Sequence, residues 1–158
     1  MSFVVSALPD NVIEMVRQSR KSPGYGHPVT EEPAKGYGPC RACLQLFDSD
    51  RDRRLLFTYN PFDGLGPIPS PGPIFIHRHD CQRFEGNGFP EGLRSLPLFF
   101  EAYRHDGSIG EQIRVSGEQV EAAISKLLAC DDVAFIHVRN YEVGCFIARI
   151  DRTTGAVA

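Results

Sequence analysis

The stretch LPLFFEAYRHDGSIGEQIRV, residues 96–115, predicts the central hairpin of the fold. Apolar and polar residues alternate on both sides of Asp106-Gly107, a dipeptide that tolerates the positive φ angles of a two-residue turn. Pairing the residues that flank this turn places Phe100 opposite Ile113 on one face, while Glu101 lies on the other. The hairpin is therefore predicted to bury one face in a core and to leave the other face polar.

A helix is predicted directly after this hairpin, over residues 117–129. Ser116 followed by Gln119 is a capping-box pattern, which satisfies amide groups at a helix start. Five apolar residues then fall on one stripe of the 3.6-residue period: Val120, Ala123, Ile124, Leu127 and Leu128.

A second helix of about three turns is predicted after Pro9-Asp10-Asn11, because proline presets φ at a helix start and basic residues follow near its end.

Further strands are predicted from β-branched and aromatic runs at residues 2–8, 54–59, 74–77, 133–139 and 144–151. The last two are expected to form a closing hairpin around residues 140–143. In that register His137 lies opposite Phe146, and Arg139 lies beside Gly144. Together these elements predict an α+β fold in which two helices pack on a mainly antiparallel sheet of about seven strands.

The length of 158 residues predicts a single globular domain over residues 1–158, with a long Gly/Pro-rich loop at 22–39. No apolar run approaches the roughly 20 residues of a membrane span. The net charge is −3 and the basic residues are scattered, which argues against nucleic-acid binding. Five cysteines, an odd number, and no basic flank before the first strand favour reduced thiols and a cytoplasmic protein.

Cysteine and histidine gather in two short segments. The first is Cys40-Arg41-Ala42-Cys43, and the second, after an apolar run, contains His77 and Cys81. Together they give the spacing C-x2-C-x33-H-x3-C, and three thiolates with one imidazole suit tetrahedral zinc, with a knuckle-like turn at residues 40–43. Such a site would tie the long loop to the sheet, so the Cys/His cluster is interpreted as structural, with zinc as the candidate ion. A catalytic metal with an open position is a weaker form of this hypothesis.

Two other interpretations of the same cysteines stay open. If Cys40 begins a helix after Pro39, the helix dipole and Arg41 would lower its pKa and make it the candidate nucleophile of a thiol enzyme. Cys43 or Cys81 would then resolve an oxidised Cys40. Alternatively, all three cysteines are small buried apolar residues with no chemistry.

A second group of candidate residues lies in the closing hairpin. His137 and Arg139 share one strand face and Asn140 follows at the turn, so with Arg41 they form a candidate ligand-binding set for a carboxylate or phosphate. The alternative is that His137 is a satisfied strand residue and that Arg139 pairs with an acidic neighbour, namely Asp131, Asp132 or Glu142.

The two Cys/His segments and the motif His137-Val138-Arg139-Asn140 with Gly144-Cys145-Phe146 carry a resemblance over about residues 36–152. The chain resembles the uncharacterised bacterial family catalogued as domain of unknown function 1203, in its patterns Gly-Pro-Cys-Arg-x-Cys-Leu, Gly-Pro-Ile-Phe-x-His-x-x-x-Cys and His-Val-Arg-Asn-x-x-x-Gly-Cys-Phe. The resemblance implies one bacterial domain of this length, and it implies no activity or cofactor. His79 is not part of that pattern.

Overall fold

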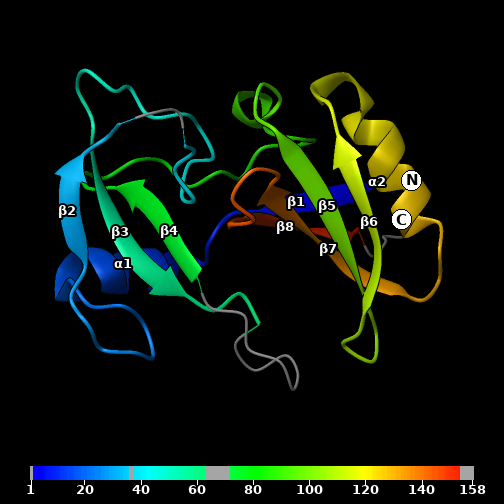
Figure 1. Cartoon of the computed structure of the whole chain (residues 1–158), viewed down its shortest axis with the longest axis horizontal. Helices are drawn as coiled ribbons and strands as arrows, with labels where there is room; N and C mark the ends of the chain where they lie inside the picture. The colour runs from blue at the N-terminus through cyan, green and yellow to red at the C-terminus, as the bar shows by residue number, and fades with distance from the viewer. Residues whose placement is uncertain (1, 36–37, 63–71, 154–158) are drawn as a thin grey trace.

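The computed structural model describes residues 2–35, 38–62 and 72–153. Within these ranges the chain forms eight β-strands and two α-helices (Figure 1). The strands form two antiparallel sheets, one of five strands in the order β1-β8-β7-β5-β6 and one of three in the order β2-β3-β4. The predicted α+β class is confirmed. The strand count is eight instead of seven, and the strands divide between two sheets.

The five-stranded sheet is covered on one face by the second helix, α2 (Figure 1). All five residues of the predicted apolar stripe are buried there, so the helix prediction is confirmed. The predicted capping box is absent, because the Ser116 side chain makes no hydrogen bond to the helix start. A 3-10 turn, η2 (Gly117–Gln119), precedes the helix. The elements of this half are β1 (Phe3–Ser6), β5 (Leu98–Arg104), β6 (Ile109–Val115), α2 (Val120–Leu128), β7 (Val133–Asn140) and β8 (Phe146–Arg152), with a short 3-10 turn η1 (Glu91–Leu93) before β5.

The hairpin of β5 and β6 has the predicted register, with Phe100 opposite Ile113. Its turn is longer than predicted, because the Arg104 amide donates to the Ser108 carbonyl at 2.8 Å and leaves three residues in the loop. Gly107 has φ 88°, as a three-residue hairpin loop with a glycine bulge requires. A β-bulge between Glu101 and Tyr103 absorbs the extra residue, which is why the inner register survives.

The closing hairpin of β7 and β8 has a different register from the predicted one. Arg139 lies opposite Phe146, and His137 lies opposite Arg149. The Asn140 side-chain oxygen accepts hydrogen bonds from the amides of residues 142 and 143 at 2.8 and 3.0 Å. This side-chain turn and Gly144, with φ 82°, lengthen the loop and shift the pairing.

The three-stranded sheet packs against the first helix, α1 (Figure 1). Its elements are α1 (Asp10–Ser19), β2 (Thr30–Pro33), β3 (Arg53–Tyr59) and β4 (Gly72–His77). Part of the predicted loop at 22–39 is therefore the strand β2, which lies at a sheet edge where proline is tolerated. Buried side chains from both layers form a second core: Ile13, Val16, Leu55, Phe57, Ile74 and Ile76.

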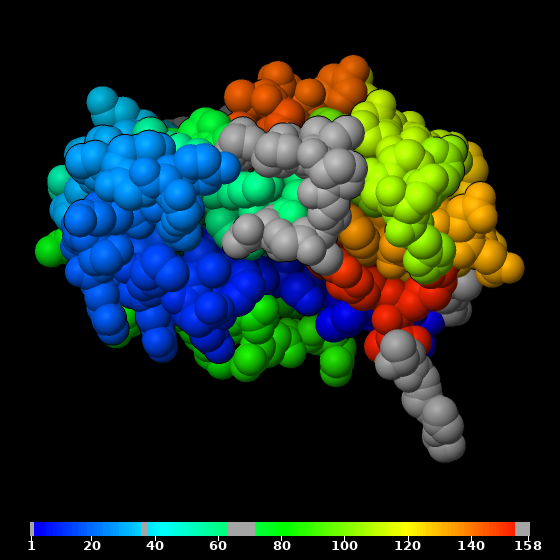
Figure 2. Space-filling model, turned by 90° about the horizontal axis from the view of Figure 1, so that it is seen from below, coloured from blue at the N-terminus to red at the C-terminus, as the bar shows by residue number. Residues whose placement is uncertain are grey.

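The two halves are connected by the N-terminal segment, in which β1 pairs with β8 before the chain enters α1. Figure 2 shows this blue segment beside the red C-terminal strand. Among the residues that the structure describes, no helix is long and apolar enough to cross a membrane.

Replacing Gly117 with alanine should destabilise the fold by about 1–3 kcal/mol, because no space is left for a larger residue at this position. A Cβ atom there would lie 2.5 Å from the backbone oxygen of Arg94, which cannot rotate away. The matched control is Gly110→Ala, whose Cβ would meet Ala102 oxygen at an ordinary 3.4 Å. Urea unfolding measures both variants, and equal stability of the two would contradict the prediction.

Candidate metal centre

The turn that carries the first two cysteines is a tight reversal of the chain. The Cys40 amide donates to the Gln45 carbonyl at 2.9 Å, and the Leu44 amide donates back to the Cys40 carbonyl at 2.8 Å. Leu44 has φ 59°, a left-handed conformation that closes the reversal. The knuckle-like turn predicted at residues 40–43 is thus present. Since Cys40 lies in a turn and starts no helix, the helix-dipole argument for a reactive Cys40 was wrong.

The four predicted ligands meet at the open side of this turn. Their ligand atoms all lie within 4.8 Å of one another. The sulfur atoms of Cys40 and Cys81 are 3.9 Å apart, and Cys43 sulfur is 3.5 Å from His77 Nδ1. A tetrahedral zinc ion with bonds of about 2.3 Å to sulfur and 2.0 Å to nitrogen separates neighbouring ligand atoms by about 3.5–3.8 Å. The predicted convergence is confirmed, and the two distances of 3.9 and 3.5 Å lie close to the spacing that such an ion requires.

The sulfur of Cys40 accepts two backbone hydrogen bonds. The amide of Ala42 donates to it at 3.4 Å and the amide of His77 at 3.3 Å. Cys81 sulfur accepts from the Arg17 guanidinium at 3.2 Å. Donors aimed at sulfur favour the thiolate, which is the form that binds a metal.

His77 is oriented by a carboxylate. Its Nε2 lies 2.9 Å from Asp52 Oδ2, which leaves Nδ1 facing Cys43. Burial opposes the charge of Asp52, but the Asp48 amide and His77 outweigh it and lower the pKa of this carboxyl. A carboxylate behind a ligating histidine fixes its tautomer and raises its basicity, as is usual at zinc sites. Sequence analysis missed Asp52, since only the register of β3 against β4 shows that it reaches His77.

The close approach of three thiols affects their ionisation. The neighbouring thiols Cys40 and Cys43, with His77 and Arg17, lower the pKa of Cys81, and Cys40 and Cys81 raise the pKa of Cys43. Burial lowers the pKa of His77, but Cys40, Cys81 and Asp52 reverse this and raise it to about 10. Three negative sulfurs repel one another, so the ionisation of all three thiols would require a cation between them.

Two arginines flank the cluster. Arg17 comes from α1 and also donates to the His77 carbonyl at 3.2 Å. Arg41 is buried and donates to the carbonyls of Phe146 and Pro39, both at 2.8 Å. Burial lowers the pKa of Arg41 to about 10, while Cys145 and Cys40 favour its charge. The predicted ligand-binding residue Arg41 therefore uses its guanidinium to hold the turn.

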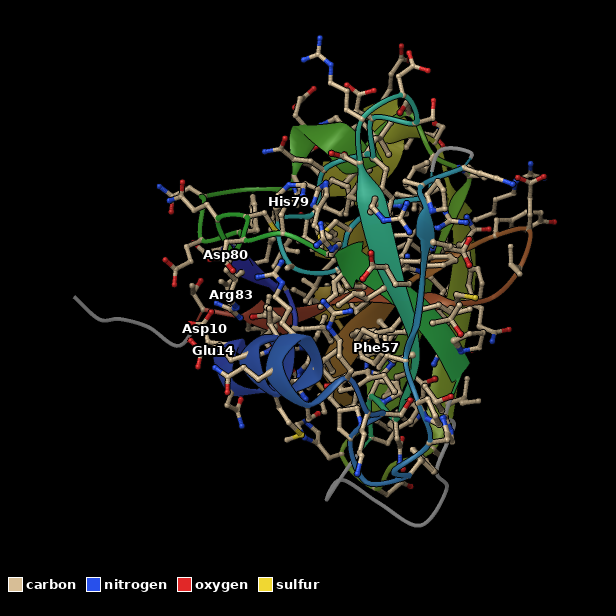
Figure 3. The ribbon with its side chains drawn as sticks, turned by 90° about the vertical axis from the view of Figure 1, so that its left-hand side faces the viewer. Asp10, Glu14, Phe57, His79, Asp80 and Arg83 are labelled. Atoms are coloured by element: carbon tan, nitrogen blue, oxygen red, sulfur yellow. The ribbon has the colours of Figure 1, made fainter. Side chains whose placement is uncertain are left out.

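His79 is exposed and lies beside the cluster, with its ring centroid 4.6 Å from that of His77. A ligand atom of His79 also lies within 4.8 Å of those of Asp52 and His77. Figure 3 places the labelled His79, Asp80 and Arg83 along the segment that follows β4 towards α1. This arrangement makes His79 an outer neighbour of the four ligands.

The second candidate group does not form one anion site. His137 and Arg139 lie at alternate positions of β7, as predicted, but the buried Arg139 donates to Glu101 at 3.1 Å and to the Gly144 carbonyl at 2.9 Å. The partner of Arg139 is thus Glu101 on β5 and none of the acidic residues expected. A concavity of about 240 Å³ lies between Arg139, Gly144 and β4, and His137 is not among the residues that line it. The Asn140 side-chain oxygen is used in the turn.

The two remaining cysteines lie outside the cluster. Cys130, just beyond the end of α2, is exposed, and Cys145 is partly exposed. All five cysteines are free thiols.

Comparison with known proteins now identifies the class of this α+β protein. The chain belongs to the family described as "Protein of unknown function (DUF1203)", whose pattern it matches over residues 37–152. This match confirms the resemblance and covers both Cys/His segments, as well as β7 and β8. No curated protein and no solved structure matches the chain significantly.

Replacing Arg139 with methionine should destabilise the protein by about 3–5 kcal/mol, because breaking a buried pair leaves an uncompensated charge. The charge concerned is Glu101, whose side chain is 9% exposed and which also accepts from Tyr103. Adding Glu101→Gln to Arg139→Met should restore part of the loss. Lys126→Met, which breaks an exposed pair with Glu111, is the control and should cost at most about 1 kcal/mol. Chemical unfolding checks all three variants, and equal losses for Arg139→Met and Lys126→Met would contradict the prediction.

Proposed function

We propose that this protein binds one zinc ion through Cys40, Cys43, His77 and Cys81, and that the ion is structural. The observation that carries the proposal is the spacing of the ligand atoms, 3.9 Å between two sulfurs and 3.5 Å between sulfur and nitrogen. Three cysteines and one histidine are a frequent ligand set of structural zinc. The Asp52 carboxylate behind His77 and the amides on Cys40 add support from outside the ligand set.

A structural role is favoured because the protein would fill all four coordination positions. Cys40, Cys43 and His77 are buried, at 0%, 8% and 6% exposure. That leaves little access for a substrate or for an activated water molecule, which catalytic zinc needs at an open position. The ion would join the turn at residues 40–44 to the end of β4 and to the segment that leads on to Cys81.

The second candidate function is a thiol-dependent or metal-dependent enzyme that uses Cys40 with Arg41 and the His137/Arg139 group. It has less support, since Cys40 has no exposed surface, and Arg41 and Arg139 are engaged in structural bonds. A dithiol function remains supported by one observation, the 3.9 Å between Cys40 and partly exposed Cys81. Metal content, together with the number of coordination positions that the protein fills, separates the two functions.

Protein purified without an affinity tag should contain about one zinc ion per chain by elemental analysis. Chelation should lower the melting temperature, because binding of a structural metal contributes directly to folding free energy. Cys81→Ser should lose both the zinc and the response to chelator. Cys130→Ser, at an exposed cysteine outside the cluster, should keep both. Metal-free protein whose melting temperature is insensitive to chelator and to added zinc would refute the zinc site.

Asp52→Asn should weaken zinc binding by about 10–100-fold, because the residue behind a ligating histidine fixes its tautomer and basicity. Asp50→Asn is the control, since Asp50 is exposed in the same loop and shares its charge. Competition with a chromophoric chelator measures both affinities. Equal zinc affinities of the two variants would mean that Asp52 does not support His77 as a zinc ligand.

Alkylation at neutral pH should label Cys130 first, because it is exposed. With zinc bound, Cys40, Cys43 and Cys81 should react slowly until a chelator is added, after which Cys81 should become the most reactive of the three. Mass spectrometry of the labelled peptides reports each site. Fast labelling of Cys81 before chelation would favour the thiol function over the zinc site.

A further inference from the structure

The imidazole of His137 is a buried polar group that the fold leaves unsatisfied. Its exposure is 0%, and among the described residues neither ring nitrogen has a hydrogen-bond partner. Four aromatic rings surround it with centroids 4.7–5.1 Å away: Phe62, Tyr103, Phe135 and Phe146. A buried donor or acceptor without a partner costs about 1–3 kcal/mol, so a fold that keeps one calls for an explanation.

His137 lines a cavity of about 360 Å³. This volume lies within the range of about 300–1,000 Å³ that is typical of sites for small molecules. The cavity lies between β7, β8 and the segment that joins β1 to α1, and its walls combine apolar and cationic side chains. Among its lining residues are Pro9, Tyr59, Arg83, Phe146 and Arg149.

The charge around the cavity is positive. Burial first, and the charges of Arg139 and Arg149 in addition, lower the pKa of His137 to about 3. The imidazole is therefore neutral, with one nitrogen that donates and one that accepts. Arg149 is paired with Asp151 at 2.9 Å.

Of the two arginines that line this cavity, Arg83 has the weaker ion pair. Its Nε and Nη2 donate to the carbonyls of Leu8 and Ala7 at 2.6 and 3.1 Å, which holds the side chain against the cavity wall. Its Nη1 is 3.7 Å from Glu85, whose side chain is 68% exposed, so this pair is weak. Figure 3 shows Arg83 on the side of the molecule that carries the N-terminal turns of α1.

We propose that this cavity binds a small organic carboxylate with an apolar, ring-sized body, and that His137 and Arg83 contact its carboxylate. The N–H of the neutral imidazole donates to one oxygen, and the guanidinium of Arg83 supplies the countercharge. The ring of the ligand packs against Tyr59, Phe146 and the prolines of the wall. The site is separate from the cysteine cluster and does not depend on a bound metal.

The test uses three probes on the protein as purified: benzoate, benzamide, which lacks the charge, and acetate, which lacks the ring. Nitrogen-15 NMR of the imidazole signals follows each titration. Benzoate should shift the His137 ring nitrogens saturably, with a dissociation constant below about 1 mM. Benzamide and acetate should each bind at least about tenfold more weakly, since each lacks one of the two recognised features.

Three variants assign the contacts. Arg83→Gln should weaken benzoate binding about tenfold and leave benzamide binding unchanged. His137→Phe should abolish benzoate binding and raise the melting temperature, because it removes two unsatisfied polar atoms. His105→Phe, at an exposed histidine in the β5–β6 loop, should leave benzoate binding unchanged.

Several outcomes would overturn the proposal. Benzamide as strong as benzoate would mean an apolar cavity without anion recognition, and acetate as strong as benzoate would mean a general anion site. No saturable shift with any probe, or full benzoate affinity in Arg83→Gln, would also refute it. Since His137→Phe is expected to gain stability, its loss of binding cannot be attributed to unfolding if its melting temperature rises.

Discussion

The backbone hydrogen bonds of Arg41 determine where the candidate metal centre lies. Its amide donates to the Phe75 carbonyl of β4 at 3.0 Å, and its carbonyl accepts from the amide of Leu8 at 3.1 Å. Its guanidinium donates to the Phe146 carbonyl of β8. One residue between the two cysteines is thus bonded to β4, to β8 and to the segment that joins β1 to α1. Since a cysteine side chain is short, its sulfur can be positioned this closely only by a backbone that is itself held.

The five-stranded sheet has two chemically different faces, and the cavity beside His137 lies on the face that α2 does not cover. Along β7, Ile136 and Val138 belong to the core that α2 covers, while Phe135, His137 and Arg139 alternate with them. Aromatic rings and the Glu101–Arg139 pair fill the space over this second face. Polar groups buried there cost free energy unless they are paired. Arg139 is paired with Glu101 and therefore has a structural role. His137 has no hydrogen-bond partner among the described residues, so it is a candidate contact for a ligand.

The sequence was sufficient for features that depend on local pattern. Alternation and the 3.6-residue stripe predicted the β5–β6 register and the buried face of α2, and ligand chemistry predicted the four residues that meet. It was insufficient where a side chain competes with the backbone. Asn140 accepts two amides of its own turn and so changes the register of β7 and β8, and no periodicity encodes that choice.

Long-range partners were missed for a related reason. Asp52 reaches His77 across 25 positions of the chain, and Glu101 reaches Arg139 across 38. Each pairing depends on a strand register that single-sequence patterns leave open. The division of the strands into two sheets, with one helix on each, likewise depends on the long connections between them.

Phe146 connects the metal centre with the cavity. Its carbonyl accepts from Arg41 in the cysteine turn, and its ring lies 4.9 Å from His137 and 6.0 Å from Tyr59. A displacement of the turn at residues 40–44 would therefore move one wall of the cavity. Phe146 therefore lines the cavity with its side chain, while its backbone carbonyl helps to hold the turn that carries Cys40 and Cys43.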